Sequence, residues 1–245
     1  MSLDTTKTVR EVALNHPGAT RVFEKLGIDY CCGGNKSLRQ ASSEANLSVQ
    51  QVLESLESAA RSTEHRRNTT GQPEDWNTAP LGDLVEHIKN KHHKYVKEEV
   101  ARLGPLFQKV SEVHGRQHPE LFELQRHFRE LAQELSMHMK KEEMVLFPYI
   151  ERMEEAVISG EPILPAPFGT VRNPVASMVH EHDSAGNLLR SMRALSDGYS
   201  APAGGCTSFK TLYSALQEFE HDLHQHIHLE NNILFPRAIE MERGA

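Results

Sequence analysis

Apolar side chains recur at helical spacing over four long stretches of the chain, roughly residues 80–103, 117–157, 174–196 and 207–242. Within each stretch the steps between apolar residues alternate between three and four, a spacing that places them on one face of an α-helix. The pattern predicts a bundle of four long helices in which neighbours run antiparallel. The segments expected to separate these helices are Gly104-Pro105, residues 160–174 and residues 200–205.

The first part of the chain predicts a smaller group of helices. Two short helices are expected before Gly27, which is the stop signal for the second. Ser37 is expected to cap a third helix. Ser48 and Gln51 form a capping box for a fourth.

Between residues 60 and 79 the apolar periodicity disappears, and polar residues, glycine and proline dominate. Such a composition is typical of a linker. The expected fold is therefore all-α. It has a helical module at residues 1–59, a linker at 60–79 and a four-helix bundle at 80–245.

The second and fourth bundle helices repeat one pattern 88 residues apart. Their residues follow the same steps of three and four, and the tripeptide Leu-Phe-Pro follows the pattern both times, which indicates an internal repeat. The predicted buried stripes are Leu121, Leu124, Phe128, Leu131, Leu135, His138, Glu142 and Val145, and Phe209, Leu212, Leu216, Phe219, Leu223, His226, Glu230 and Ile233.

Each stripe places a histidine and a glutamate, four residues apart, where apolar residues stand elsewhere on the stripe. A buried carboxylate without compensation costs several kcal/mol or becomes neutral. A bound metal ion supplies the compensating charge, and residues four apart lie on one helical face. The alternative is a polar core layer of two His–Glu hydrogen bonds. The repeated spacing favours the metal site, with His138, Glu142, His226 and Glu230 as ligands.

The other two bundle helices each offer a further histidine. His182 lies on the apolar stripe of the third helix. In the first helix, periodicity alone does not choose between His92 and His93, because two apolar stripes are present, offset by one residue. The sequence separations of 45 residues from His93 to His138 and 44 from His182 to His226 favour His93.

Six converging donors are more than a single zinc ion requires, since structural zinc has four ligands. Imidazole and carboxylate suit iron, manganese or zinc, and two bridging carboxylates with two terminal histidines per metal describe a di-metal site in a bundle. The expected cofactor is a pair of non-haem iron ions with an oxo or hydroxo bridge, and manganese is the alternative.

Charge and composition exclude several classes of function. The formal net charge is -7 and no Lys/Arg cluster is present, so no nucleic-acid partner is expected. No apolar run approaches the roughly 20 residues that cross a bilayer, and the first residues lack the apolar stretch of a signal peptide. Three cysteines, two of them adjacent, make no disulfide framework. The expected location is the cytoplasm.

The adjacent Cys31 and Cys32 are candidates for redox or transfer chemistry. Neighbouring Cα atoms are about 3.8 Å apart, so a disulfide between them would be strained and readily reduced. The alternative is that both pack a loop as small side chains. Cys206 is interpreted as a packing residue.

Several motifs span nearly the whole chain in order, namely Asp29-Tyr30-Cys31-Cys32-Gly33-Gly34, His92-His93, His138 to Glu143, Glu181-His182-Asp183, His226 to Asn232, and the two Leu-Phe-Pro tripeptides. With these motifs the chain resembles the repair-of-iron-centres (RIC) family of the YtfE/ScdA type, with its C-terminal hemerythrin-like domain. The resemblance selects His93 rather than His92, with His138, His182 and His226 as terminal ligands and Glu142 and Glu230 as bridges.

The resemblance implies repair of iron–sulfur clusters damaged by nitrosative or oxidative stress, for example by iron donation, with damaged iron–sulfur proteins as partners. Oxygen-carrying hemerythrins place another histidine on the third helix, four residues from the first, where this chain has Met178 and Gly186, so oxygen carriage is disfavoured. The alternative function is binding or reduction of nitric oxide, as a sink, sensor or reductase. Whether the protein is an enzyme, and whether it forms a homodimer, stays open.

Overall fold

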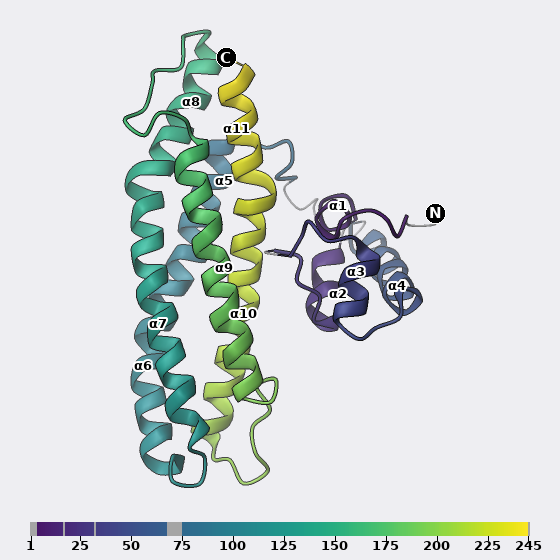
Figure 1. Ribbon diagram of the computed structural model, residues 1–245, viewed down its shortest axis with the longest axis vertical. Helices are drawn as coiled ribbons and strands as arrows, with labels where there is room; N and C mark the ends of the chain where they lie inside the picture. Colours follow the sequence, from purple (N-terminus) through teal and green to yellow (C-terminus); the bar gives the residue numbers. More distant parts are fainter. Residues whose placement is uncertain (1–3, 17, 32, 68–74, 245) are drawn as a thin grey trace. The chain divides into compact units, whose positions relative to one another are not determined.

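Helices are the regular elements of the computed structural model throughout the part of the chain that it describes (Figure 1). That part comprises residues 4–16, 18–31, 33–67 and 75–244, with residues 61–67 described by their backbone alone. The all-α prediction is therefore confirmed. Backbone contacts divide the chain into two units, residues 1–80 with 227–236, and residues 81–226 with 237–245. None of the described helices is both long and apolar enough to cross a membrane.

Four helices occupy the first 67 residues, and local sequence signals explain where they begin and end. Gly27 ends the second helix in the left-handed region, at φ 68°. The Ser37 hydroxyl accepts a hydrogen bond from the Gln40 N–H at 3.2 Å, and the expected capping box of Ser48 and Gln51 is present. These helices are α1 (Val9–Asn15), α2 (Ala19–Leu26), α3 (Leu38–Glu44) and α4 (Val49–Arg67).

The four helices enclose a small apolar core of their own. Its members come from all four, so each helix buries one face against the others. They include Val9, Val12, Phe23, Ile28, Leu38, Val52 and Leu56.

Helix α4 continues to Arg67, into the range where the sequence predicted a linker from residue 60. Residues 60–67 contain neither glycine nor proline, and the first of these breakers follow at Gly71 and Pro73. Loss of an apolar stripe shows that a helix is not packed on that face, but it does not end the helix. The predicted linker range therefore overlaps the end of α4, and the division into domains stays a prediction.

The described helices from Leu81 onward form four long rods that run up and down in alternation (Figure 1). A π-helical turn, labelled η, interrupts three of the four. The rods are α5 (Leu81–His87), η1 (Ile88–His93) and α6 (Lys94–His114); α7 (Glu120–Lys141), η2 (Glu142–Leu146) and α8 (Phe147–Ser159); α9 (Arg172–Leu195); and α10 (Thr207–Leu229), η3 (Glu230–Leu234) and α11 (Phe235–Gly244).

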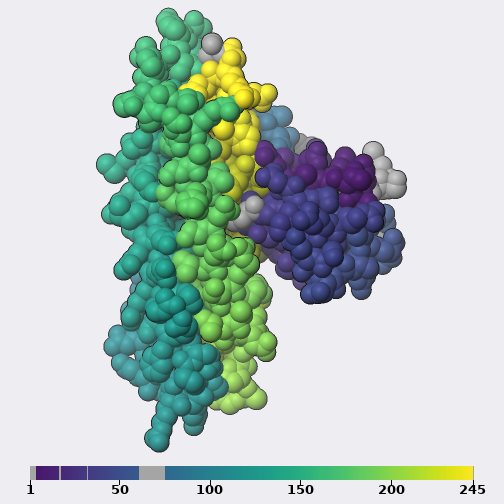
Figure 2. Space-filling view, in the orientation of Figure 1, coloured from purple at the N-terminus to yellow at the C-terminus, as the bar shows by residue number. Residues whose placement is uncertain are grey.

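Helices α7 and α9 lie side by side along the face of the bundle that Figure 2 shows, and their side chains fill the space between the two ribbons. Leu124 and Leu131 of α7, with Leu189 of α9, are among the completely buried side chains, at 0–1% exposed. The prediction from the spacing is therefore confirmed. Steps of three and four residues between apolar side chains place them on one face of each rod, and that face packs against the other rods.

Gly104-Pro105 does not end the first rod, contrary to the sequence prediction, since α6 runs on to His114. The buried stripe continues through this point with Leu103, Phe107 and Val110. Pro105 lies on the exposed face, as does Ala101, whose carbonyl loses its helical hydrogen bond because proline has no N–H. The packing of the stripe outweighs the helix-breaking tendency of the two residues.

Replacing Gly104 with alanine is expected to raise the free energy of unfolding by about 0.5–1 kcal/mol. The position is helical and exposed, and a Cβ added there meets no atom within 4 Å. Urea denaturation of Gly104→Ala measures the change. Gly27→Ala is the opposing control, because its φ of 68° makes a side chain unfavourable, and it is expected to lower stability. Loss of stability in Gly104→Ala would contradict the regular helix at this position.

Candidate metal centre

Six charged or titratable side chains meet in the apolar interior of the bundle. Three belong to π-helical turns, where His93 ends η1, Glu142 begins η2 and Glu230 begins η3. The other three stand on regular helices, namely His138 on α7, His182 on α9 and His226 on α10. Each of the six residues is no more than 2% exposed.

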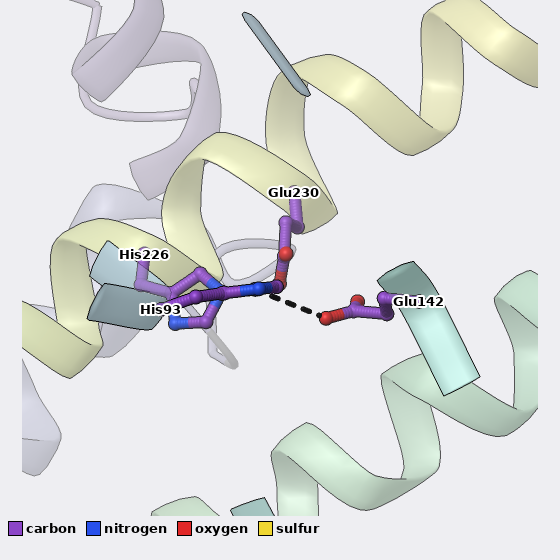
Figure 3. A group of neighbouring side chains, drawn as sticks. All are labelled: His93, Glu142, His226 and Glu230. Atoms are coloured by element: carbon purple, nitrogen blue, oxygen red, sulfur yellow. Dashed lines mark hydrogen bonds and ion pairs between the residues drawn. The ribbon is translucent and has the colours of Figure 1, made fainter. Parts of the chain in front are cut away.

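The six side chains form two overlapping sets of four potential metal-binding atoms. Within each set the four atoms lie within 4.8 Å of one another. Figure 3 shows one set, in which the His93 and His226 rings face the two carboxyl groups. The sets are His93, Glu142, His226 and Glu230, and His138, Glu142, His182 and Glu230, so both glutamates belong to both sets.

The distances divide the four histidines into two pairs. The Nε2 atoms of His93 and His226 are 3.2 Å apart, and those of His138 and His182 are 3.0 Å apart. Glu142 lies between the pairs. Its Oε2 is 3.4 Å from the His93 Nε2, and its Oε1 is 3.2 Å from the His138 Nε2. One carboxyl group thus presents one oxygen to each pair of imidazoles.

Two further glutamates orient two of the imidazole rings by contacting the nitrogen that faces away from the cluster. The His93 Nδ1 is 2.7 Å from Glu143 Oε1, and the His138 Nδ1 is 3.0 Å from Glu181 Oε2. Because an ionised carboxylate only accepts hydrogen bonds, each Nδ1 is assigned as the donor, which leaves the lone pair of each Nε2 directed inward. This is the arrangement that a metal-binding histidine requires.

A lysine keeps each of these outer carboxyl groups ionised. Lys97 Nζ is 2.7 Å from Glu143 Oε1, and Lys141 pairs with Glu181. Partial burial raises the pKa of the Glu143 carboxyl, but hydrogen bonds from Lys97 and His93 outweigh burial and hold the pKa below its usual value. The pKa of Glu181 is lowered in the same way, with Lys141 and His138 as donors.

Sequence periodicity did not single out Glu143 and Glu181 as functional residues, because neither lies on a buried stripe. What could have identified these two glutamates is their position next to a predicted metal ligand in the sequence. Glu143 directly follows Glu142, and Glu181 directly precedes His182. A residue next to an inward-facing helical position lies at the rim of the interface, where it can reach a ring on the neighbouring helix.

Both His92 and His93 are completely buried, each at 0% exposed, but only His93 belongs to a set of metal-binding atoms. The His92 Nδ1 is 3.0 Å from Asp222 Oδ1, and its ring stacks on that of His226, with centroids 5.6 Å apart. His92 therefore packs behind His226.

The π-helical turns explain both the ambiguity in the first rod and one wrong prediction. A π-turn contains an additional residue, so the buried face shifts by one position as the chain passes through η1. The two offset stripes are both real, one before the turn and one after it. In η2 the same shift exposes Val145, at 46%, and buries Leu146, at 1%, whereas the sequence placed Val145 on the buried stripe.

The cysteines lie outside both sets of metal-binding atoms within the described ranges. Cys31 is buried, and its thiol is 3.4 Å from Asp29 Oδ1. Cys32 is outside the described residues. Cys206 was interpreted as a packing residue, which is wrong, because it is exposed just before the first turn of α10.

The fold and the site define a hemerythrin-type cation-binding protein. A family model described as the hemerythrin HHE cation binding domain matches residues 83–238, and a model for ScdA_N, a domain of unknown function, matches residues 5–60.

Similar proteins match almost the whole chain. The iron-sulfur cluster repair protein YtfE of Edwardsiella ictaluri is 37% identical over 94% of this chain and 95% of its own length. YtfE of Pectobacterium atrosepticum is 34% identical over 96% of this chain and 98% of its own, and a probable iron-sulfur cluster repair protein of Haemophilus influenzae is 33% identical over 94% and 95%. This chain belongs to the family of these YtfE proteins, which confirms the family that its motifs predicted.

Proposed function

We propose that this protein binds two iron ions at the buried histidine–glutamate cluster. The observation that carries the proposal is that both carboxyl groups belong to both sets of potential metal-binding atoms. A carboxyl group shared between two sets is the arrangement that bridges two ions. The proposed ligands are His93 and His226 for one ion and His138 and His182 for the other, with Glu142 and Glu230 bridging the two.

The donor set fits a pair of ions better than it fits a hydrogen-bonded polar layer. An ionised carboxylate in an apolar interior costs several kcal/mol unless nearby positive charge offsets it, and here there are two such groups. Glu143 and Glu181 direct the lone pairs of two imidazoles toward the same small region. Two metal cations offset the buried negative charge and use those lone pairs together.

The types of the ligand residues limit which metals the site can bind. Imidazole with carboxylate suits iron, manganese or zinc, and a carboxylate-bridged pair inside a helical bundle is typical of di-iron proteins. The names of the YtfE relatives also point to iron chemistry. Iron is therefore the proposed occupant and manganese the alternative, and metal analysis of the purified protein distinguishes them.

We infer that the protein supports the repair of iron–sulfur clusters damaged by nitrosative or oxidative stress. The inference rests on the printed function of relatives that match nearly the full chain, together with a site suited to iron. When bound, the iron pair supplies a metal ion for transfer to a damaged cluster and positions for a small ligand such as nitric oxide or dioxygen. The proposed partners are damaged iron–sulfur proteins of the cytoplasm.

We infer that Glu143 and Glu181 help to determine how firmly the ions are held, because each contacts one of the proposed histidine ligands. The side chains of Glu143 and Glu181 are 29% and 28% exposed, so each lies between solvent and a buried imidazole. Each glutamate contacts both a lysine and a histidine, so loss of the glutamate removes the hydrogen bond that orients that histidine. Groups in this position typically change metal affinity by about 10–100-fold when lost.

The test is reactivation of an iron–sulfur enzyme whose cluster has been damaged by nitric oxide. Iron-loaded protein is expected to restore activity and apo protein is not, and equal recovery with both would reject iron donation. Catalytic consumption of nitric oxide by the reduced protein, without reactivation, would support the alternative function. A Cys31→Ser/Cys32→Ser variant in the same assay tests the proposed redox or transfer role, which full activity with normal folding would remove.

A further inference from the structure

Cys206 and His114 form a pair of side chains at the end of the bundle where α10 begins. The thiol of Cys206 is free and exposed, and His114 Nε2, in the last turn of α6, is 3.1 Å from its sulfur. The N–H groups of Phe209 and Ser208, in the first turn of α10, donate hydrogen bonds to the same sulfur. The sulfur therefore has an imidazole on one side and a helix N-terminus on the other.

The Phe209 side chain holds the imidazole of this pair in place. Its ring is completely buried, at 0% exposed, and meets the His114 ring edge-on with centroids 5.3 Å apart. Because the same residue donates its N–H to the sulfur, one buried anchor positions both partners. His118 also contacts the Phe209 ring, at 5.3 Å, but its Nδ1 is directed to Glu120 at 3.0 Å.

The surroundings leave the sulfur open to reagents. Cys206 is exposed, and the two residues before it, Gly204 and Gly205, have no side chains that could cover the sulfur. A Cβ added at Gly204 would meet no atom within 4 Å.

The hydrogen bonds to the sulfur favour the thiolate, which is the nucleophilic form. The Phe209 N–H, followed by His114, lowers the pKa of the Cys206 thiol from 9.0 to about 7. The titratable groups near the sulfur are His114 and, beyond it, His118 with Glu120. At pH 7.5 about three-quarters of such a thiol is ionised, against about 3% of a thiol whose pKa is 9.

We propose that the Cys206–His114 pair is a site of reversible S-thiolation by low-molecular-weight disulfides such as oxidised glutathione. The Cys206 thiolate attacks one sulfur of the disulfide, the original S–S bond breaks, and a new S–S bond joins Cys206 to one half of the reagent. The other half leaves as a thiolate and takes a proton from His114 or water. The disulfide is reduced to one free thiol while Cys206 is oxidised to the mixed disulfide.

This site is separate from the proposed iron centre. His226 lies on α10, 20 residues after Cys206, which directly precedes this helix, so the two are about 30 Å apart at 1.5 Å per residue. Neither partner belongs to the sets of metal-binding atoms. The proposal therefore does not depend on the proposed function and can be tested without measuring it.

The first experiment measures the rate of Cys206 alkylation by iodoacetamide in the iron-loaded, full-length protein as a function of pH. Peptide mapping by mass spectrometry assigns the product to Cys206 and separates it from Cys31 and Cys32. The midpoint is expected below pH 8 in the wild type. His114→Phe, which keeps the ring packed on Phe209 but removes both nitrogens, is expected to raise it by about half a pH unit or more.

His118→Phe is the matched control, because it changes the neighbouring histidine on the same Phe209 ring and is expected to leave the midpoint unchanged. In a second experiment the wild-type protein is incubated with oxidised glutathione. A single adduct on Cys206 is expected, and dithiothreitol is expected to remove it. A wild-type midpoint at pH 8 or above, an unchanged midpoint in His114→Phe, or no adduct on Cys206 would overturn the proposal. The wild-type measurements alone decide the outcome if a variant fails to fold.

Discussion

The Glu142→Ala protein is expected to lose both iron ions, with iron falling from about two per chain to less than about 0.5. Glu142 is completely buried, and its two oxygens face different pairs of imidazoles. Removing the Glu142 side chain takes away one proposed ligand of each ion. It also removes one of the two buried negative charges that favour the binding of both ions. Metal analysis by atomic emission measures the result.

The matched control is Glu143→Gln, which changes the next residue along the chain. It leaves all six proposed ligands present but weakens the hydrogen bond that orients His93. Two ions are expected to bind at saturating iron, with affinity lowered by about 10–100-fold. Retention of two ions at normal affinity by Glu142→Ala would contradict the bridging role.

Thermal unfolding of the metal-free proteins separates loss of the site from loss of the fold. Without metal, the cost of the buried Glu142 carboxyl group and the cost of the cavity that alanine leaves act in opposite directions, so apo Glu142→Ala is expected to unfold within a few degrees of apo wild type. Unfolding at a markedly lower temperature would show that the variant lacks iron because its fold is damaged.

The second prediction concerns which histidines share an ion. The double variant His93→Ala/His226→Ala is expected to lose one ion and keep the other, with no greater loss than either single variant. His93→Ala/His182→Ala is expected to lose both. The reason is that the Nε2 atoms pair as His93 with His226, at 3.2 Å, and His138 with His182, at 3.0 Å.

Iron stoichiometry of the two double variants and of the three single variants, His93→Ala, His182→Ala and His226→Ala, completes this comparison. Residues that bind the same ion are strongly non-additive, whereas residues that bind different ions act independently. Equal losses in the two double variants would contradict the pairing. Both doubles remove two buried imidazoles, so general damage to the core affects them alike and cannot produce the expected difference.

Much of the architecture could be read from periodicity, and its failures have identifiable causes. The long helices and the repeat were predictable because a stripe of apolar residues must be buried. The sequence predicted that the first rod ends at Gly104-Pro105, because these residues have a low helix propensity. Propensity is a local property, whereas α6 continues because its apolar stripe packs against other helices. The extension of α4 past residue 60 was missed for a related reason, since a polar segment without breakers can remain helical.

The sequence by itself determined that His138, Glu142, His226 and Glu230 occupy inward-facing positions, because spacing along a helix specifies which face a residue shares. It could not determine which side chains meet across the bundle. Only the tertiary structure decided the pairing of the four histidines, the contacts of Glu143 and Glu181 and the approach of His114 to Cys206. Those depend on how rods distant in sequence are placed beside one another, and on π-turns that shift the buried face by one residue.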